Sequence, residues 1–297
     1  MGLLLEFRNI CAIMNEITDR ELRTVFTKAD VEQQLLQLQG KKGSITLVHT
    51  SLRAVGEVDG GAEGLLDALI KHFTRDGGLL CVPTHTWHHL DDGQQPMLDM
   101  LSDDTCLGVL SAIAIRDGRG IRTENPTHSM VVFGDRERAL TFIKDEKVVE
   151  TPTAPESCYG KLYTMDGQVL LIGVAHNRNT YLHAVDEILA TSNRMDAKSI
   201  PMVVKNGVYE ETRRITLYYT DYCEDISWRF PKYETAFRYH GCITDGFIGN
   251  APVQLCDAVK MKDAVELIFR NSGGEDPLYG ETPIPQKWYC KFKNNNT

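Results

Sequence analysis

The stretch SITLVHTSLRAVGEVDGGAEGLLDALIKHFTRDGGLLCVPT (44–84) indicates the fold class most directly. It begins with SITLVHT (44–50), a short apolar run typical of a buried strand. Glycines then mark a loop, and GAEGLLDALIKHF (61–73) repeats apolar residues at helical intervals. GLLCVPT (78–84) is a second apolar run of strand length. Strand, helix and strand at this spacing predict a mixed or parallel sheet that is covered by helices.

The same alternation continues on both sides of this stretch. Upstream, the segment from Thr18 to Gln39 predicts two short helices, with capping candidates at Thr18 and Asp30. Downstream, the periodicity predicts further strands and helices. The strands are expected at 129–134 and 168–174, and the helices at 107–117, 135–143 and 180–190.

From residue 200 onward the pattern changes. ITLYYTDY (215–222) alternates as a strand does, the segment 228–240 is rich in aromatic residues, DAVELIFRN (263–271) is helical, and the final KNNNT is expected to be disordered. No low-complexity linker or internal repeat divides the chain. We therefore expect a single α/β domain over residues 1–297, with a core at 17–190 and a C-terminal section at 191–290 that completes the fold.

Composition excludes several classes of protein. The 297 residues are 42% hydrophobic and 25% charged, which is ordinary for a globular chain and excludes disordered, collagenous and coiled-coil proteins. The formal charge of −9 disfavours nucleic-acid binding and favours the approach of a cationic small molecule. No apolar run approaches the roughly 20 residues that span a bilayer, and no export signal is visible. The eight cysteines show no CxxC spacing, so we expect reduced thiols and a cytoplasmic protein without a membrane partner.

Two segments that follow strands are candidates for chemistry. HTSLR (49–53) lies between a buried strand and a glycine-rich turn, where backbone N–H groups and hydroxyls can bind an anion such as a phosphate, although an ordinary turn would look the same. In NTYLHAVDE (179–187), a cap at Asn179 or Thr180 would place His183 in the first turn of a helix. Asp186 and Glu187 would then share its face, where a carboxylate could orient the imidazole of a general base; a surface histidine–acid pair is the alternative.

RTENPTHS (122–129) allows two interpretations. Arg122 could clamp an anion and His128 or Ser129 could donate into a pocket, or the turn could satisfy its own backbone with its hydroxyls.

Histidines also gather at HTWHH (85–89), and Asp91 and Asp92 follow them. A metal-dependent hydrolase built on His85, His88, His89 and Asp91 is one hypothesis, and a polar surface loop is the other. The acids around this loop could instead line a pocket for an amine-rich substrate, with acids of the C-terminal third added to it. These acids are Asp91, Asp92, Asp99, Asp103 and Asp104, and then Asp221, Glu224 and Asp225.

Taken in order, these motifs resemble those of the aminoglycoside N(3)-acetyltransferase family. VHTSLRAVGEVDGGAEGLLDAL (48–69) is similar to that family's His-Ser-Ser-Leu-Arg, Gly and Gly-Gly-Ala run. LLCVPTHT (79–86) and RTENPTHSMVVFG (122–134) follow. SCYGKLYTMDGQVLLIGVAHNRNTYLHAVDE (157–187) is similar to the family's Leu-Leu-Gly-Val, Asn-Thr and His-x-x-Glu series. The resemblance is strong over residues 30–190 and weaker at GFIGNA (246–251).

The resemblance implies a three-layer α/β/α fold with a central mixed sheet, distinct from the GNAT architecture. It also implies transfer of acetyl from acetyl-CoA to the 3-amino group of a deoxystreptamine ring, without a metal or a covalent enzyme intermediate. His183 falls on the family's general base, and Asp186 on the acid three residues later, with Glu187 beside it. The coenzyme site would comprise His49, Thr50, Ser51, Leu52, Arg53, Val55, Arg122 and Ser129, and the substrate site Thr84, Thr86, His128, Asp91 and Asp92.

The sequence departs from the family in three places. Asp186 stands where many members have Glu, Asn125 where many have His before the proline, and Thr50 where they have Ser. These changes leave the acceptor open, so an acyl-CoA-dependent acyltransferase acting on another metabolite amine is an alternative, and a non-enzymatic coenzyme-binding protein is another. The oxyanion donors could be the backbone of residues 50–53 or the hydroxyls of Thr84 and Thr86. A monomer and a homodimer are both compatible with the sequence.

Overall fold

The computed structural model describes residues 25–90, 96–218, 225–279 and 283–290. Its centre is a mixed sheet in which β1 runs parallel to both β2 and β6, while β5 and β10 run antiparallel to these neighbours. In spatial order the seven strands are β4 (Ile121–Arg122), β5 (Met130–Gly134), β2 (Leu79–Pro83), β1 (Ile45–Thr50), β6 (Gln168–Ile172), β10 (Ala251–Asp257) and β9 (Ile243–Ile248).

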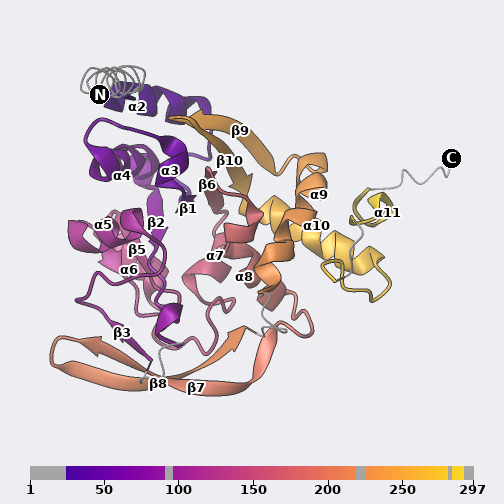
Figure 1. Cartoon of the computed structure of the whole chain (residues 1–297). Helices are drawn as coiled ribbons and strands as arrows, with labels where there is room; N and C mark the ends of the chain where they lie inside the picture. The colour runs from indigo at the N-terminus through magenta and orange to yellow at the C-terminus, as the bar shows by residue number, and fades with distance from the viewer. Residues whose placement is uncertain (1–24, 91–95, 219–224, 280–282, 291–297) are drawn as a thin grey trace, which may run out of the picture.

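Helices cover both faces of this sheet, which gives three layers (Figure 1). The central strands are apolar at successive positions, as strands buried on both faces are. In β1, for example, Leu47 packs into the core on one face and Val48 into the core on the other. One face carries α2 (Lys28–Gln37), α3 (Leu52–Val55), α4 (Gly61–Phe73) and α5 (Val109–Asp117). The other carries α6 (Arg136–Ile143), α7 (Cys158–Thr164), α8 (Tyr181–Ile188), α9 (Glu234–Tyr239), α10 (Ala258–Asn271) and α11 (Gln286–Tyr289).

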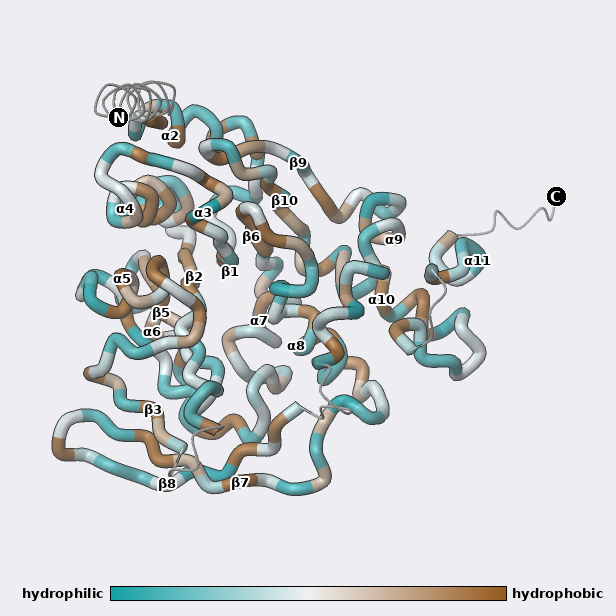
Figure 2. Tube along the Cα trace, viewed as in Figure 1, coloured by the Kyte–Doolittle hydropathy of each residue, from teal (hydrophilic) through white to brown (hydrophobic). Residues whose placement is uncertain are grey.

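A second, smaller sheet lies at one end of the molecule (Figure 1). It consists of β3 (Met97–Asp99) and the long hairpin of β7 (Met195–Asn206) and β8 (Tyr209–Tyr218). Figure 2 shows the hairpin as alternating hydrophilic and hydrophobic segments, whereas hydrophobic residues dominate the central strands. The hairpin therefore has one face toward the protein and one toward solvent.

The three-layer α/β fold with a mixed sheet confirms the predicted fold class. Asp30 does not cap its helix: Thr27 is the N-cap of α2, and Asp30 is the third helical residue of a capping box with it. The first of the two helices predicted between residues 18 and 39, and the C-terminal KNNNT, lie outside the described residues. Among the described helices, none is long and apolar enough to cross a membrane.

Candidate active site

Four histidines from four separate segments meet at one edge of the main sheet. His49 lies near the carboxyl end of β1, His85 follows β2, and His183 lies in α8, which comes after β6. His128 precedes β5, and because β5 is antiparallel to β2, its beginning lies at the same edge. The rings of His85 and His128 are 4.2 Å apart, and the charges of His49 and His183 would act on His85. Carboxyl ends of parallel strands are where α/β folds place their sites.

Two tyrosines complete this cluster. The Nε2 atom of His85 lies 2.7 Å from the hydroxyl of Tyr159. The ring of His183 stacks on Tyr218 at 4.1 Å with an interplanar angle of 10°, and the Tyr218 hydroxyl lies 2.6 Å from Oγ1 of Thr153. Tyr218 comes from the end of the β7–β8 hairpin. The small sheet thus contributes a wall to a site that the main sheet builds.

Burial keeps all four imidazoles neutral. It lowers the pKa of His183 to about 4, and the pKa values of His49 and His128 to about 3. It also lowers the pKa of His85 to well below the usual value. The carboxylate of Asp225 opposes the effect of burial at His183, whereas the charge of Arg194 adds to it. At neutral pH each ring is therefore unprotonated, and burial also makes it a weaker proton acceptor than a free imidazole.

The helix that carries His183 differs from the prediction in its cap and its acids. Thr180 occupies the N-cap position of α8 but makes no capping bond with its side chain, and the amide of Asn179 lies 3.2 Å from Nδ1 of His176. Asp186 and Glu187, the predicted catalytic acids, contact other groups. Asp186 accepts a hydrogen bond from Arg194 at 2.9 Å, and Glu187 accepts bonds from Thr151 and Thr153. The carboxylates of Asp186 and Glu187 thus accept hydrogen bonds from groups other than His183.

Among the residues that the structure describes, Asp225 is an acid that faces His183. Its Oδ1 lies 3.9 Å from Nε2 of His183 and also accepts the backbone N–H of Ser227 at 2.9 Å, at the beginning of the 3₁₀ helix η4 (Ile226–Tyr233). The His183 side chain is 8% exposed and that of Asp225 46% exposed. The sequence named Asp225 as a possible acid of a pocket, but nothing local links it to His183. Asp221 and Glu224, named with it, lie outside the described residues.

The predicted coenzyme run surrounds the end of β1. Nε2 of His49 and Oγ1 of Thr50 are buried and have no hydrogen-bond partner. Ser51 caps the short helix α3 by accepting the N–H of Ala54, and Arg53 is exposed. Gly173, at the end of β6, has a φ of +64°, and a Cβ there would lie 2.4 Å from that of Ala54, so only glycine fits.

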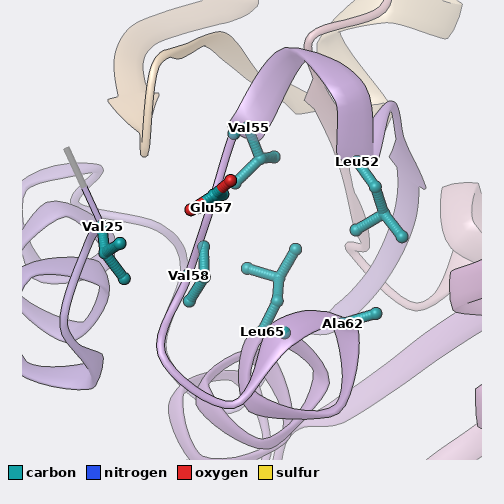
Figure 3. A pocket seen from close by; sticks show the side chains of 9 residues that line it. Val25, Leu52, Val55, Glu57, Val58, Ala62 and Leu65 are labelled. Carbon is teal, nitrogen blue, oxygen red and sulfur yellow. The ribbon is translucent and has the colours of Figure 1, made fainter. Parts of the chain in front are cut away.

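An apolar cavity lies beside this run. Its volume is about 320 Å³, and its lining includes Leu52 and Val55 from α3 and Val58, Ala62 and Leu65 from the beginning of α4 and the loop before it. Figure 3 shows the side chains of Leu52 and Leu65 directed into the space between the two helices. The cavity can take an apolar chain, while the unpartnered atoms at the end of β1 can bind polar groups.

Other predicted site residues serve the protein's own structure. Oγ of Ser129 donates to the carbonyl of Thr84 and lies 2.8 Å from its hydroxyl, and the hydroxyl of Thr86 donates to the carbonyl of Pro126. All three residues are buried, so the hydroxyls of Thr84 and Thr86 are engaged rather than free for an oxyanion. Asn125 organises the turn that presents His128, since its side-chain oxygen accepts the N–H of His128.

Arg122, the predicted anion clamp, uses part of its guanidinium for backbone carbonyls. Its guanidinium donates to the carbonyls of Asp99 and Ser102. Burial lowers its pKa to about 10, while Asp99, Asp103 and Asp104 supply the charges nearby. Nε and Nη2 of Arg122 are buried and have no hydrogen-bond partner, so its role toward an anion stays a prediction. Asp91 and Asp92, predicted to bind substrate, lie outside the described residues.

The comparison with protein families matches residues 47–270 to the aminoglycoside 3-N-acetyltransferase model. An aminoglycoside N(3)-acetyltransferase IV from Salmonella is 32% identical over 160 residues, which cover 54% of this chain and 58% of that protein. An aminoglycoside N(3)-acetyltransferase III from Pseudomonas aeruginosa is 24% identical over 282 residues, 88% of this chain and 99% of the relative.

Solved structures share the fold over most of the chain. A mutant of aminoglycoside acetyltransferase AAC(3)-IVa, crystallised in complex with a gentamicin, superposes with a TM-score of 0.70 at 24% identity over 89% of this chain and 96% of that one. YokD from Bacillus subtilis gives 0.72 at 21% identity over 86% and 98%, and AAC-IIIb with CoASH gives 0.70 at 22% identity over 86% and 100%. The family model covers most of the sequence and these structures share its fold, so the chain belongs to the aminoglycoside 3-N-acetyltransferase family, as its motifs predict.

Proposed function

We propose that this protein transfers the acetyl group of acetyl-CoA to the 3-amino group of an aminoglycoside's deoxystreptamine ring, with His183 as the general base. The observation that carries this proposal is the buried, neutral imidazole of His183, 3.9 Å from a carboxylate, at the sheet edge where the coenzyme run also ends. Acetyl-CoA supplies a thioester carbonyl that a neutral amine can attack. The 3-amino group must therefore lose its ammonium proton to solvent before it attacks, and a second proton must leave the nitrogen during the attack.

His183 receives that proton. As the nitrogen–carbon bond forms and the carbon–sulfur bond breaks, a proton leaves the amine nitrogen for His183 Nε2, and it is then available to the departing thiolate. Burial alone makes imidazolium unfavourable, and Asp225 offsets this because its carboxylate raises the pKa of His183. The histidine is therefore unprotonated when substrate binds and is stabilised when it carries the proton.

Residues 49–55 bind the coenzyme in this proposal. The unpartnered Nε2 of His49 and Oγ1 of Thr50 offer polar contacts, and the adjacent cavity offers an apolar surface for the coenzyme's chain. Arg53 is exposed beside them and can reach a phosphate. The N–H groups of Leu52 and Arg53 are the first of α3 and so have no partner within that helix, which makes them donors for the oxyanion.

Asp186 and Glu187 are positioning residues in this proposal. Asp186 and Arg194 form an ion pair in which both side chains are 3% exposed, and Arg194 also pairs with Asp276, which ties α8 to the segment that follows α10. Glu187 bonds Thr153, whose hydroxyl lies against that of Tyr218, the ring that stacks on His183. Both acids thus fix the surroundings of the base without touching it.

Acids at the rim of the site would hold the remaining ammonium groups of the substrate. Asp225 is half exposed beside His183. Asp103 lies on a segment that hydrogen bonds tether to the site, because Thr105 and Cys106 both donate to the carbonyl of His85. With a net charge of −9, the protein attracts a polycation.

Release of free CoA from acetyl-CoA, measured with a thiol reagent against gentamicin, kanamycin, neomycin and simpler amines, tests the function. We expect turnover with the deoxystreptamine compounds and acetylation at the 3-amino group in the product. Turnover only with other amines would show that the acceptor is a different metabolite amine, as in the alternative acyltransferase. Acetyl-CoA binding without turnover on any amine would overturn the proposal in favour of a coenzyme-binding protein.

A further inference from the structure

A cluster of metal-ligating side chains lies outside the proposed catalytic machinery. His88 and His89 are consecutive residues of the 3₁₀ helix η2 (Trp87–Leu90), and Asp104 follows β3. One ligand atom from each of the three residues can be chosen so that all lie within 4.8 Å of one another. We propose that His88, His89 and Asp104 bind a divalent transition-metal ion, with Zn²⁺ as the ion that their donor set suits best.

The geometry around one carboxylate oxygen supports this. Oδ2 of Asp104 lies 2.8 Å from Nε2 of His89 and 3.3 Å from Nε2 of His88. Without a metal, both nitrogens would need to carry a proton to bond this oxygen. A single cation between the three atoms would satisfy all of them at once. Two ligands about 2.1 Å from a tetrahedral ion lie about 3.4 Å apart, close to the longer of these distances.

The partial exposure of the three ligand side chains also allows a metal ion to bind. The side chains of His88, His89 and Asp104 are 36%, 24% and 51% exposed. An ion can enter from solvent. The half-exposed carboxylate of Asp104 can rotate and so lengthen its 2.8 Å distance to Nε2 of His89. A water molecule can be the fourth ligand of the ion. Two imidazoles and one carboxylate are a donor set that zinc accepts with tetrahedral geometry.

Backbone hydrogen bonds hold the two ligand-bearing segments in place. The N–H of His89 donates to the carbonyl of Thr86, and the N–H of Cys106 donates to that of His85. The N–H of Asp104 donates to the hydroxyl of Ser102, and the carbonyl of Ser102 accepts a hydrogen bond from the partly buried Arg122. Arg122, which the sequence suggested for an anion, therefore organises the segment that presents Asp104. Bound metal would link the segment after β2 to the segment after β3.

This site differs from the metal-dependent hydrolase considered from the sequence. Of the residues in that hypothesis, His85 is buried against Tyr159 and Asp91 lies outside the described residues. Only His88 and His89 are shared, and Asp104 replaces the others. The ion would bind beside the catalytic cluster and take no part in acetyl transfer.

Metal titration of the full chain, prepared without a histidine tag and stripped with EDTA, tests the proposal. We expect calorimetry with ZnCl₂ to show one strong site per chain, and CoCl₂ to give the visible absorption of tetrahedral Co²⁺. His89→Gln and Asp104→Asn should each weaken Zn²⁺ binding by about 10–100-fold or more, since loss of supporting groups alone costs that much.

His72→Gln is the matched control, because His72 lies on α4, away from the cluster, and should leave Zn²⁺ affinity unchanged. Thermal melts without metal verify that the variants are folded. Wild-type affinity in both ligand variants, or wild-type binding no stronger than that of the His89→Gln, Asp104→Asn double variant, would overturn the proposal. Neither readout depends on acetyl transfer, so failure here leaves the proposed function intact.

Discussion

Replacing Asp225 with Asn should lower the rate of acetyl transfer. We expect a larger loss than from any other carboxylate near His183 that can be replaced in a protein that still folds. The substitution keeps the size of the side chain and removes the charge that faces His183. The variant should fold, because the side chain of Asp225 is half exposed and an amide oxygen can still accept the N–H of Ser227.

The expected size of the effect comes from the distance between the two groups. Nε2 of His183 and Oδ1 of Asp225 are 3.9 Å apart, and unit charges at this distance interact by about 1–4 kcal/mol between the dielectric of water and that of a protein surface. Because water screens the half-exposed carboxylate, we take the lower end of this range. About 1–2 kcal/mol corresponds to a loss of about 5–30-fold in kcat.

Free CoA release, measured from pH 5 to pH 9 at saturating substrates, is the assay. The Asp225→Asn enzyme should lose kcat throughout this pH range, because the carboxylate raises the pKa of His183 in the wild-type protein and its loss leaves a weaker base. Glu275→Gln, which removes an exposed charge, is the control and should behave as wild type. Unchanged kcat and pH profile in Asp225→Asn, together with a large loss in a folded Asp186→Asn protein, would refute the reasoning and restore Asp186 as the partner of the base.

Three other substitutions test the ion pair, the buried histidine and the coenzyme site. Arg194→Met leaves the buried carboxylate of Asp186 and the partly buried carboxylate of Asp276 unpaired, and it should lower the free energy of unfolding in urea by about 3–5 kcal/mol; a loss below 1 kcal/mol would contradict the buried ion pair. Burial holds the pKa of His128 at about 3, so the folded chain binds fewer protons than the unfolded chain below about pH 6.5, and His128 costs stability as the pH falls. His128→Gln should therefore gain about 1 kcal/mol relative to wild type between pH 6.5 and pH 5.5, and a constant difference would show that His128 titrates normally. Arg53→Ala should raise the KM for acetyl-CoA by about tenfold at unchanged kcat, the value of one charged hydrogen bond, whereas an unchanged KM would remove Arg53 from the coenzyme site.

Much of the main sheet is predictable because its signals are local. The strand at 44–50 is buried on both faces and reads as a continuous apolar run, and the helix at 61–73 shows a clear 3.6-residue period. The sequence does not predict the strand Met195–Asn206, because most of its residues are exposed or partly exposed and its buried alternation is limited to Met202 and Val204. The strand Ile243–Ile248 was missed for a similar reason, since it is an edge strand with only Ile248 buried.

The site likewise contains residues that local motifs predict and contacts that only the folded chain creates. His183 and the run that begins at His49 were found as local motifs beside strands, but their meeting with His85 and His128 depends on the order of strands in the sheet. Spacing along a helix placed Asp186 near His183. That spacing does not indicate that the chain turns after α8, nor that Arg194 then donates a hydrogen bond to the carboxylate of Asp186. Asp225 reaches His183 only through the folding of the C-terminal part of the chain.

The role of His183 as the general base is the central claim, and kinetics of the His183→Gln enzyme test it most directly. Gln is polar and of similar size but cannot accept the proton at neutral pH. The account predicts that kcat for an aminoglycoside falls by about 10²–10⁴-fold while the Kd for acetyl-CoA, measured by calorimetry, stays at the wild-type value. A His183→Gln enzyme that retains the wild-type kcat would contradict it.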